Sequence, residues 1–230
     1  MAKINLFLQA RMSSERLPGK VLLPLADFSV LELQIRRLSH TKRINELIVL
    51  TSTNPEDDSI IEECKKLDVP FFRGSLDDVL SRFVKALETF PCDHLIRCTA
   101  DNPLNDSRII DELIEQYYSD RCEVEYMTTP HDRCVPRGTG GEIFTAEAIH
   151  RCARLTTDPV DREHVTRFIQ HNPSLFKPKK MRLSDPYPEC RLTLDTPSDY
   201  ERLKKICNHF QEECLTVEVR NIIDWLNSPR

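Results

Sequence analysis

A short basic loop follows the first apolar segment of this 230-residue chain. Arg11, Arg16 and Lys20 lie within ten residues of one another, directly after an apolar run at 4–8 that predicts a buried first strand. Cations crowded into one loop repel each other, and a bound polyanion relieves that repulsion. Ligands of open α/β sheets bind at the carboxyl ends of the strands, so the loop predicts a triphosphate site. A solvated basic loop is the alternative.

The chemistry that such a loop supports is phosphoryl or nucleotidyl transfer. These reactions need in-line positioning and neutralisation of charge on phosphate oxygens. Arginine offers paired donors for those oxygens, and lysine offers a point charge. The loop matches neither the Walker A pattern nor G-x-G-x-x-G, because its only glycine is Gly19. Phosphate binding would therefore depend on side chains more than on backbone amides.

Two aspartates are predicted to lie at strand tips near this loop. Asp101 follows the expected strand 93–99, and Asp195 ends the expected strand 191–195; a proline comes two residues after each. Proline stops a strand and favours a turn. Two carboxylates at one sheet edge would share a Mg²⁺ ion, which takes one or two protein carboxylates together with phosphate and water. A turn or helix-capping role is the alternative for Asp101.

Two further segments combine ionisable groups. One, 136–142, surrounds flexible glycines with Arg137 and Glu142; the other, 161–166, places charged residues and His164 at the start of a helix. Helix capping and a solvated face are the alternative for the second segment. His164 taken alone is more often an ordinary hydrogen-bonded histidine than a base.

Composition narrows the class of protein. The net charge of -5 argues against general nucleic-acid binding, and no stretch approaches the roughly 20 apolar residues of a membrane span. The N-terminus lacks the pattern of a signal peptide, so we expect a cytoplasmic protein. The nine cysteines form no C-x-x-C pair, which predicts free thiols in a reducing compartment and no zinc site.

Apolar runs alternate with helical patterns up to about residue 122. This alternation predicts a parallel sheet with helices on both faces. The expected strands and helices, in chain order, are strand 4–10, helix 30–39, strand 44–52, helix 57–67, strand 69–73, helix 77–90, strand 93–99 and helix 106–118.

The pattern changes after residue 122, where a strand and a glycine-containing loop precede further helices. No Gly/Ser- or Pro-rich linker interrupts the chain, which favours one domain, 1–230, with a substrate or dimerisation lobe within about 123–190. The expected elements are strand 123–129, loop 130–141, helices 145–155 and 162–171, strands 181–183 and 191–195, and helices 198–210 and 217–227.

The segment 9–20, Gln-Ala-Arg-x-x-Ser-x-Arg-Leu-Pro-Gly-Lys, resembles the signature loop of the cytidylyltransferases that make CMP-activated acidic sugars. These are the CMP-ketodeoxyoctulosonate and CMP-sialic acid synthetases. The closer resemblance is to the spore coat polysaccharide biosynthesis protein F branch. It covers nearly the whole chain in order, through the blocks 72–83, 97–104, 161–166 and 191–200.

The resemblance implies a nucleotide-diphospho-sugar transferase fold, a three-layer α/β/α sandwich around a mixed, mainly parallel sheet. It implies Mg²⁺-dependent attack of a sugar hydroxyl on the α-phosphate of CTP, with release of pyrophosphate, in surface polysaccharide biosynthesis. The implied partners are CTP, an acidic sugar or related acceptor, and a second copy of the chain, with no nucleic acid and no membrane.

The resemblance also implies roles for individual residues. Arg11, Arg16 and Lys20 would bind the triphosphate and serve as catalytic residues, and Asp101 and Asp195 would ligate Mg²⁺. The other nucleotide-binding candidates are Gln9, Ala10, Ser13, Ser75 and Asp78; those on the acceptor side are Arg97, Arg137, Glu142, Arg162 and His164. One departure is that Gly140 stands where similar sequences have the aspartate of Pro-x-Gly-x-Asp-x-Glu, so the acceptor here is expected to differ.

Two other functions remain open. One is another enzyme on the same fold, either a nucleotidyltransferase that uses a different nucleotide or a phosphate or phosphonate acceptor, or a glycosyltransferase. The other is a non-catalytic nucleotide-binding protein. Retention of Asp101, Asp195 and all three loop cations argues against the last of these.

Overall fold

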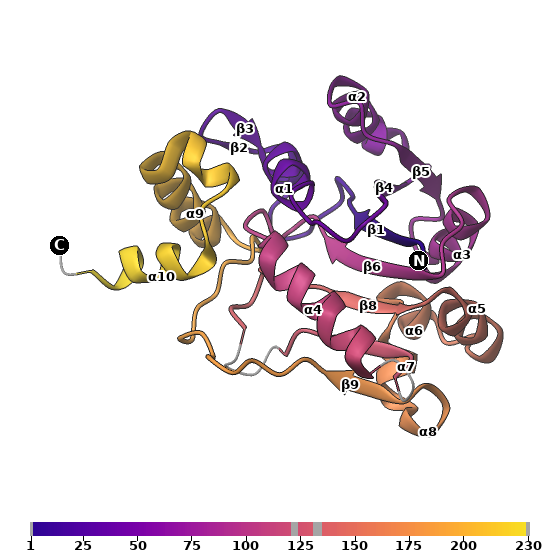
Figure 1. Ribbon diagram of the computed structural model, residues 1–230. Helices are drawn as coiled ribbons and strands as arrows, with labels where there is room; N and C mark the ends of the chain where they lie inside the picture. Colours follow the sequence, from indigo (N-terminus) through magenta and orange to yellow (C-terminus); the bar gives the residue numbers. More distant parts are fainter. Residues whose placement is uncertain (1, 121–123, 131–134, 229–230) are drawn as a thin grey trace.

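The computed structural model describes residues 2–120, 124–130 and 135–228 (Figure 1). Its centre is a seven-stranded sheet in the order β5-β4-β1-β6-β8-β7-β9. All neighbouring pairs are parallel except the two that β8 makes with β6 and β7. The strands are β1 (Ile4–Gln9), β4 (Glu46–Ser52), β5 (Phe71–Gly74), β6 (His94–Thr99), β7 (Tyr126–Thr128), β8 (Glu142–Thr145) and β9 (Pro178–Lys180).

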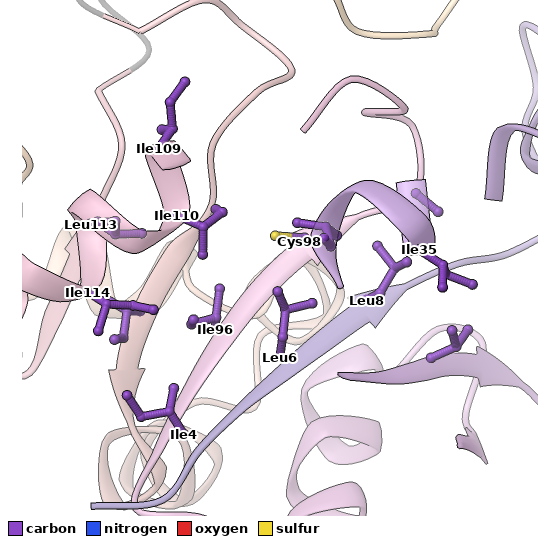
Figure 2. Close-up of a cluster of buried hydrophobic side chains, with 14 of the residues drawn as sticks. Ile4, Leu6, Leu8, Ile35, Ile96, Cys98, Ile109, Ile110, Leu113 and Ile114 are labelled. Atoms are coloured by element: carbon purple, nitrogen blue, oxygen red, sulfur yellow. The ribbon is translucent and has the colours of Figure 1, made fainter. Parts of the chain in front are cut away.

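Helices cover both faces of the sheet because successive strand residues point to opposite sides. Leu6 and Leu8 of β1 pack in one cluster with residues of α1 (Val30–Leu38), α2 (Asp58–Lys66) and α4 (Ser107–Asp120), part of which Figure 2 shows. Phe7 packs on the other face against residues of α3 (Val79–Thr89) and α5 (Ala146–Leu155). The predicted three-layer α/β/α sandwich with a mixed, mainly parallel sheet is confirmed.

A third apolar cluster joins the two ends of the chain. The closing helix α9 (Pro197–Phe210) packs beside the short pair β2 (Pro24–Leu25) and β3 (Phe28–Ser29) (Figure 1), and α10 (Val219–Asn227) contributes to the same cluster. Leu192 and Leu194 are fully buried in this cluster. Packing of these leucines carries the segment that contains Asp195 to the edge of the main sheet.

The expected strand 191–195 is wrong. Only Arg191 forms a bridge, with Arg137, while the amides of Leu192 and Leu194 donate to the carbonyls of Arg137 and Asp101. The alternating apolar pattern of this segment reflects burial in the third cluster rather than membership of the sheet. Asp195 consequently reaches the site from an irregular segment.

Three other boundaries differ from expectation. The expected helix 162–171 is two helices, α6 (Pro159–His164) and α7 (Arg167–His171), separated at Val165, whose φ of 59° no helix accommodates. The strand expected at 181–183 is β9, a few residues earlier. Strand β8 was not expected: it occupies the short stretch between the expected loop 130–141 and the expected helix 145–155. Residues 123 and 131–134 of the expected strand and loop lie outside the described residues.

Seven of the cysteines fall within the described residues, and all are free thiols; Cys122 and Cys134 lie outside them. Burial raises the pKa of Cys64 and of Cys98 to about 12, so both thiols are protonated and poorly nucleophilic. No helix in the described part of the chain combines the length and apolarity needed to cross a bilayer.

Candidate active site

A pocket of about 850 Å³ opens at the carboxyl ends of β1 and β6. Its walls come from the basic loop, the two strand ends, α6 and the segment before α9. Nine of the predicted site residues line it: Gln9, Ala10, Arg11, Ser13, Arg16, Lys20, Asp101, His164 and Asp195. Residues from four separated parts of the sequence therefore meet at one edge of the sheet.

A second hollow, of about 920 Å³, lies where α1 ends and α4 begins. No predicted site residue lines it. Several of its charged residues already bind other protein groups: Arg43 pairs with Glu115, and Asp111 accepts a hydrogen bond from the amide of Lys42. The hollow beside the basic loop is therefore the candidate active site.

The basic loop is fixed at both of its ends. Gly19 adopts a left-handed conformation, with φ of 68°, and its amide donates to the Met12 carbonyl at 3.0 Å. The Met12 amide in turn donates to Asp57 Oδ1 at 2.7 Å. Asp57 is buried and also accepts from the amide and hydroxyl of Ser52. Burial alone would raise the pKa of Asp57, but the hydrogen bonds from Ser52 and Met12 outweigh it and hold that pKa below its ordinary value.

Lys20 connects the two predicted metal ligands. Its Nζ lies 3.4 Å from Asp101 Oδ2, 3.2 Å from Asp195 Oδ1 and 2.8 Å from the Leu194 carbonyl oxygen. The Lys20 side chain is only 12% exposed, so the ion pairs are partly shielded from water. The aspartates lie far apart in sequence, yet their carboxylates converge on one point.

Further groups orient the two carboxylates. Asp101 Oδ1 accepts from the Thr99 hydroxyl at 2.6 Å. Asp195 contacts Arg16 Nη2 at 3.3 Å and Arg191 Nη2 at 2.6 Å. Sequence reasoning missed Arg191, because a spacing of four residues brings side chains together on a helix and this segment is not helical.

The donor set fits a hard divalent cation. Two carboxylates that converge on one cation supply the oxygen ligands that Mg²⁺ takes from proteins. The described residues contain no group of three or more His, Cys, Asp or Glu side chains placed to hold a metal ion. A closed protein cage is therefore not built here, and the remaining ligands of a cation at this point would be phosphate oxygens and water.

A buried network sets the orientation of Gln9. Arg97 Nη1 pairs with Glu142 Oε2 at 2.7 Å, and its Nε and Nη2 donate to Gln9 Oε1. Burial would raise the pKa of Glu142, but the charge of Arg97 and hydrogen bonds from Tyr126, Arg97 and Thr166 lower it below the ordinary value. Arginine has only donors, so the oxygen of the Gln9 amide faces Arg97 and its NH₂ group faces away. Arg97 and Glu142 thus stand behind the pocket wall.

Ser75, Asp78 and Arg162 lie outside the residues that line the pocket. Asp78 caps α3 by accepting from the Ser81 amide, and its Oδ2 accepts from Arg162 Nη2 at 2.8 Å. The Ser75 hydroxyl accepts from the Asp78 amide. These contacts join α3 to α6, and direct roles for the three residues in nucleotide or acceptor binding stay predictions.

The glycine segment contributes packing near the site. Arg137 is exposed, and its backbone pairs with the segment before Asp195. A Cβ atom at Gly140 would lie 2.3 Å from Thr129 Oγ1, so an aspartate there would clash with Thr129. Lack of space beside Thr129 is therefore consistent with glycine, rather than the expected aspartate, at position 140. Any role of Arg137 in acceptor binding stays a prediction.

Helix α6 carries two residues of the far pocket wall. His164 and Glu163 both line the pocket, and Glu163 Oε1 lies 3.8 Å from Arg11 Nη2. Glu163 was not predicted as a site residue, although it lies inside the recognised block 161–166. This contact places a carboxylate from the second half of the chain against the basic loop.

The model of the family described as "Cytidylyltransferase" matches residues 6–219, which is most of the chain. The chain belongs to the cytidylyltransferase family. The predicted resemblance is confirmed, and membership identifies an enzyme, a CTP-dependent nucleotidyltransferase. The matched span contains every predicted site residue.

The similarity to individual cytidylyltransferase relatives extends over almost the full length. The spore coat polysaccharide biosynthesis protein SpsF of Bacillus subtilis is 33% identical, over 90% of this chain and 87% of its own. A cytidylyltransferase structure from Leptospira borgpetersenii superposes with a TM-score of 0.92 at 32% identity, covering 98% of this chain and 94% of that one. A structure of CMP:2-keto-3-deoxy-manno-octonic acid synthetase complexed with CTP superposes with a TM-score of 0.72 at 16% identity, covering 90% and 99%. The last likeness supports the fold alone.

Proposed function

We propose that this cytidylyltransferase transfers CMP from CTP to a hydroxyl group of an acidic sugar or a related acid, and releases pyrophosphate. The main support for this proposal is the position of Lys20 between Asp101 and Asp195, at the pocket that Arg11 and Arg16 line. Such an arrangement supplies cations for a triphosphate and carboxylates for Mg²⁺ in one place. The relation to SpsF supports a role in surface polysaccharide biosynthesis, which we place in the cytoplasm.

Each residue of the pocket has a part in this reaction. Arg11, Arg16 and Lys20 would bind the triphosphate and neutralise charge that develops on the leaving pyrophosphate. Asp101 and Asp195 would hold Mg²⁺, which supplies charge neutralisation at the phosphate oxygens. Gln9, Ala10 and Ser13 would contact the nucleotide along the end of β1.

The acceptor enters from the side formed by α6. His164 lies on that wall and would contact the acceptor, whereas Arg97 and Glu142 would act on it through Gln9. Phosphoryl chemistry of this kind depends on alignment and charge more than on a strong base. We therefore assign no general base to the attack of the sugar hydroxyl.

A homodimer is part of the proposal, built on the lobe within about 123–190. Among the described residues, the most exposed large apolar side chains are Leu155, Val160 and Leu175, and all three lie in this lobe. A second copy bound to this lobe would cover such side chains. Sedimentation of the purified chain at micromolar concentration tests this, and a purely monomeric profile would contradict it.

The test of the proposed reaction is a pyrophosphate-release screen. Purified protein is incubated with CTP, Mg²⁺ and a panel of sugar acids, with ATP, GTP and UTP as matched nucleotides. We expect release only when CTP and an acidic acceptor are both present. Equal or better release with another nucleotide would overturn the assignment of CTP, and release with neutral sugars or phosphate compounds alone would overturn the assignment of the acceptor.

A further inference from the structure

All four carboxylate oxygens of Asp101 and Asp195 already have partners in the protein. Asp101 uses the Thr99 hydroxyl and Lys20, and Asp195 uses Lys20 and Arg16 on one oxygen and Arg191 on the other. A divalent cation at this point would therefore meet ammonium and guanidinium groups of the same sign. Repulsion by these cations opposes binding of the metal as long as they keep these positions.

Lys20 is the cation that controls this competition. It is the one that touches both aspartates, and its side chain is 12% exposed against 64% for Arg16 and 37% for Arg191. Interactions between charges strengthen as water is excluded, so the partly buried ammonium is the strongest competitor. A third bond, to the Leu194 carbonyl, and the turn at Gly19 hold the ammonium in place.

On the basis of the proposed function, we infer that Lys20 and the divalent cation compete for Asp101 and Asp195. We infer also that the bound triphosphate shifts this competition in favour of the metal. Phosphate oxygens offer the ammonium a new anionic partner a short distance away and offer the metal additional ligands. The metal and the nucleotide then each increase the affinity of the protein for the other, and the coupling is reciprocal. Lys20 thereby keeps the pair of aspartates neutralised and aligned until the nucleotide is present.

The test measures binding of Mn²⁺ alone, without nucleotide, to the full chain by electron paramagnetic resonance or calorimetry. Removing the competing charge in Lys20→Met should tighten Mn²⁺ binding, by on the order of tenfold for two ion pairs of this kind. Lys65→Met is the matched control, because Lys65 lies on the exposed face of α2 and, among the described residues, pairs with Glu62 alone. The control should bind Mn²⁺ as the wild type does.

A second arm adds CTP in the absence of any acceptor. In the wild type, CTP should increase the affinity for Mn²⁺ strongly, and in Lys20→Met this increase should be smaller because the free protein already binds the metal. Thermal unfolding confirms that the variant is folded. Lys20→Arg keeps the positive charge and should retain weak Mn²⁺ binding, which provides a test if the methionine variant fails to fold.

Several outcomes overturn the inference. Equal or weaker Mn²⁺ binding by folded Lys20→Met would show that the ammonium does not compete, and tight binding by Lys20→Arg would show that charge is not the cause. Pyrophosphate release from CTP by the wild type is measured in parallel. If release occurs while Lys20→Met gains no affinity for Mn²⁺, the inference fails and the proposed function stands.

Discussion

Arg97 Nε and Nη2 both donate to Gln9 Oε1, at 3.3 and 3.2 Å. Arg97 is itself held by Glu142, which also accepts from Tyr126, Thr166 and Gln170. Among the described residues the Gln9 NH₂ group has no protein partner. It is therefore available to donate to a ligand, and its orientation is set from the interior of the protein.

Replacing Gln9 with glutamate tests this orientation. The carboxylate keeps a partner for Arg97 but presents an acceptor in place of a donor, next to anionic substrates. We expect the kcat/KM of pyrophosphate release to fall by at least about tenfold, with an unchanged melting temperature. Gln9→Ala, which removes the donor without adding charge, should lose less. Equal kinetics in the glutamate variant would show that the NH₂ group contacts no substrate.

Asp101→Asn tests the metal assignment. The amide keeps the shape of the side chain and removes the charge, so we expect turnover to fall by more than about a hundredfold while the fold persists. Asp224→Asn, on the exposed face of α10, is the matched control and should retain full turnover. Wild-type turnover by the Asp101 variant would count decisively against a metal at this aspartate.

Arg191→Met tests whether this arginine positions Asp195. Loss of the 2.6 Å contact frees one carboxylate oxygen, so we expect kcat to fall by about three- to tenfold with partial rescue in Arg191→Lys. Arg202→Met removes a partner of Asp199 on the same side of α9 and leaves Asp195 untouched. A kinetic loss of the same size in the Arg202 variant would assign the effect to the helix rather than to Asp195.

Asp57 makes stability depend on acidity. Its pKa in the folded protein lies below the ordinary value of 3.8, so the stability it contributes is fully present above that value and is lost as pH falls through the lower, folded value. Denaturant unfolding of the wild type and Asp57→Asn should therefore show a difference in unfolding free energy that is constant near neutrality and shrinks below about pH 4. A difference that stays constant down to pH 2 would contradict this account.

Gly140→Asp tests whether this position tolerates the aspartate that the resemblance led us to expect. The new Cβ would meet Thr129 at 2.3 Å, so we expect a loss of about 1–3 kcal/mol in unfolding free energy. Adding Thr129→Ala removes the two closest contacts and should recover part of that loss, which a double-mutant cycle would measure. Independent, additive effects would show that the clash does not occur.

The sequence predicted the sheet, its two helical layers and the convergence of the basic loop with Asp101 and Asp195. Buried strands such as β1 and the helices that alternate with them carry strong periodic signals. The same reasoning failed for 191–195, because alternating leucines look alike in a strand and in an irregular segment packed on helices. It also failed at Val165, where a left-handed residue that no local pattern marks divides one expected helix into two.

Side-chain partnerships were the least predictable part of the site. Arg97 and Glu142 are predicted on the acceptor side, but their pairing depends on the antiparallel register that sets Arg97 opposite Glu142. Asp78 and Arg162 similarly form an ion pair with each other where α3 meets α6. Such pairings depend on how segments far apart in the sequence are placed in the fold, and residue type and spacing alone do not specify them.

The bond from Lys20 to the Leu194 carbonyl has a consequence for biosynthesis, because it joins residues 174 positions apart. A chain emerging from the ribosome has its basic loop early and its second aspartate only near the end. Until the backbone bonds of Leu192 and Leu194 form and α9 packs against β2, that aspartate is not held beside the loop. The two aspartates can therefore meet beside the loop only after nearly all of the chain has been made.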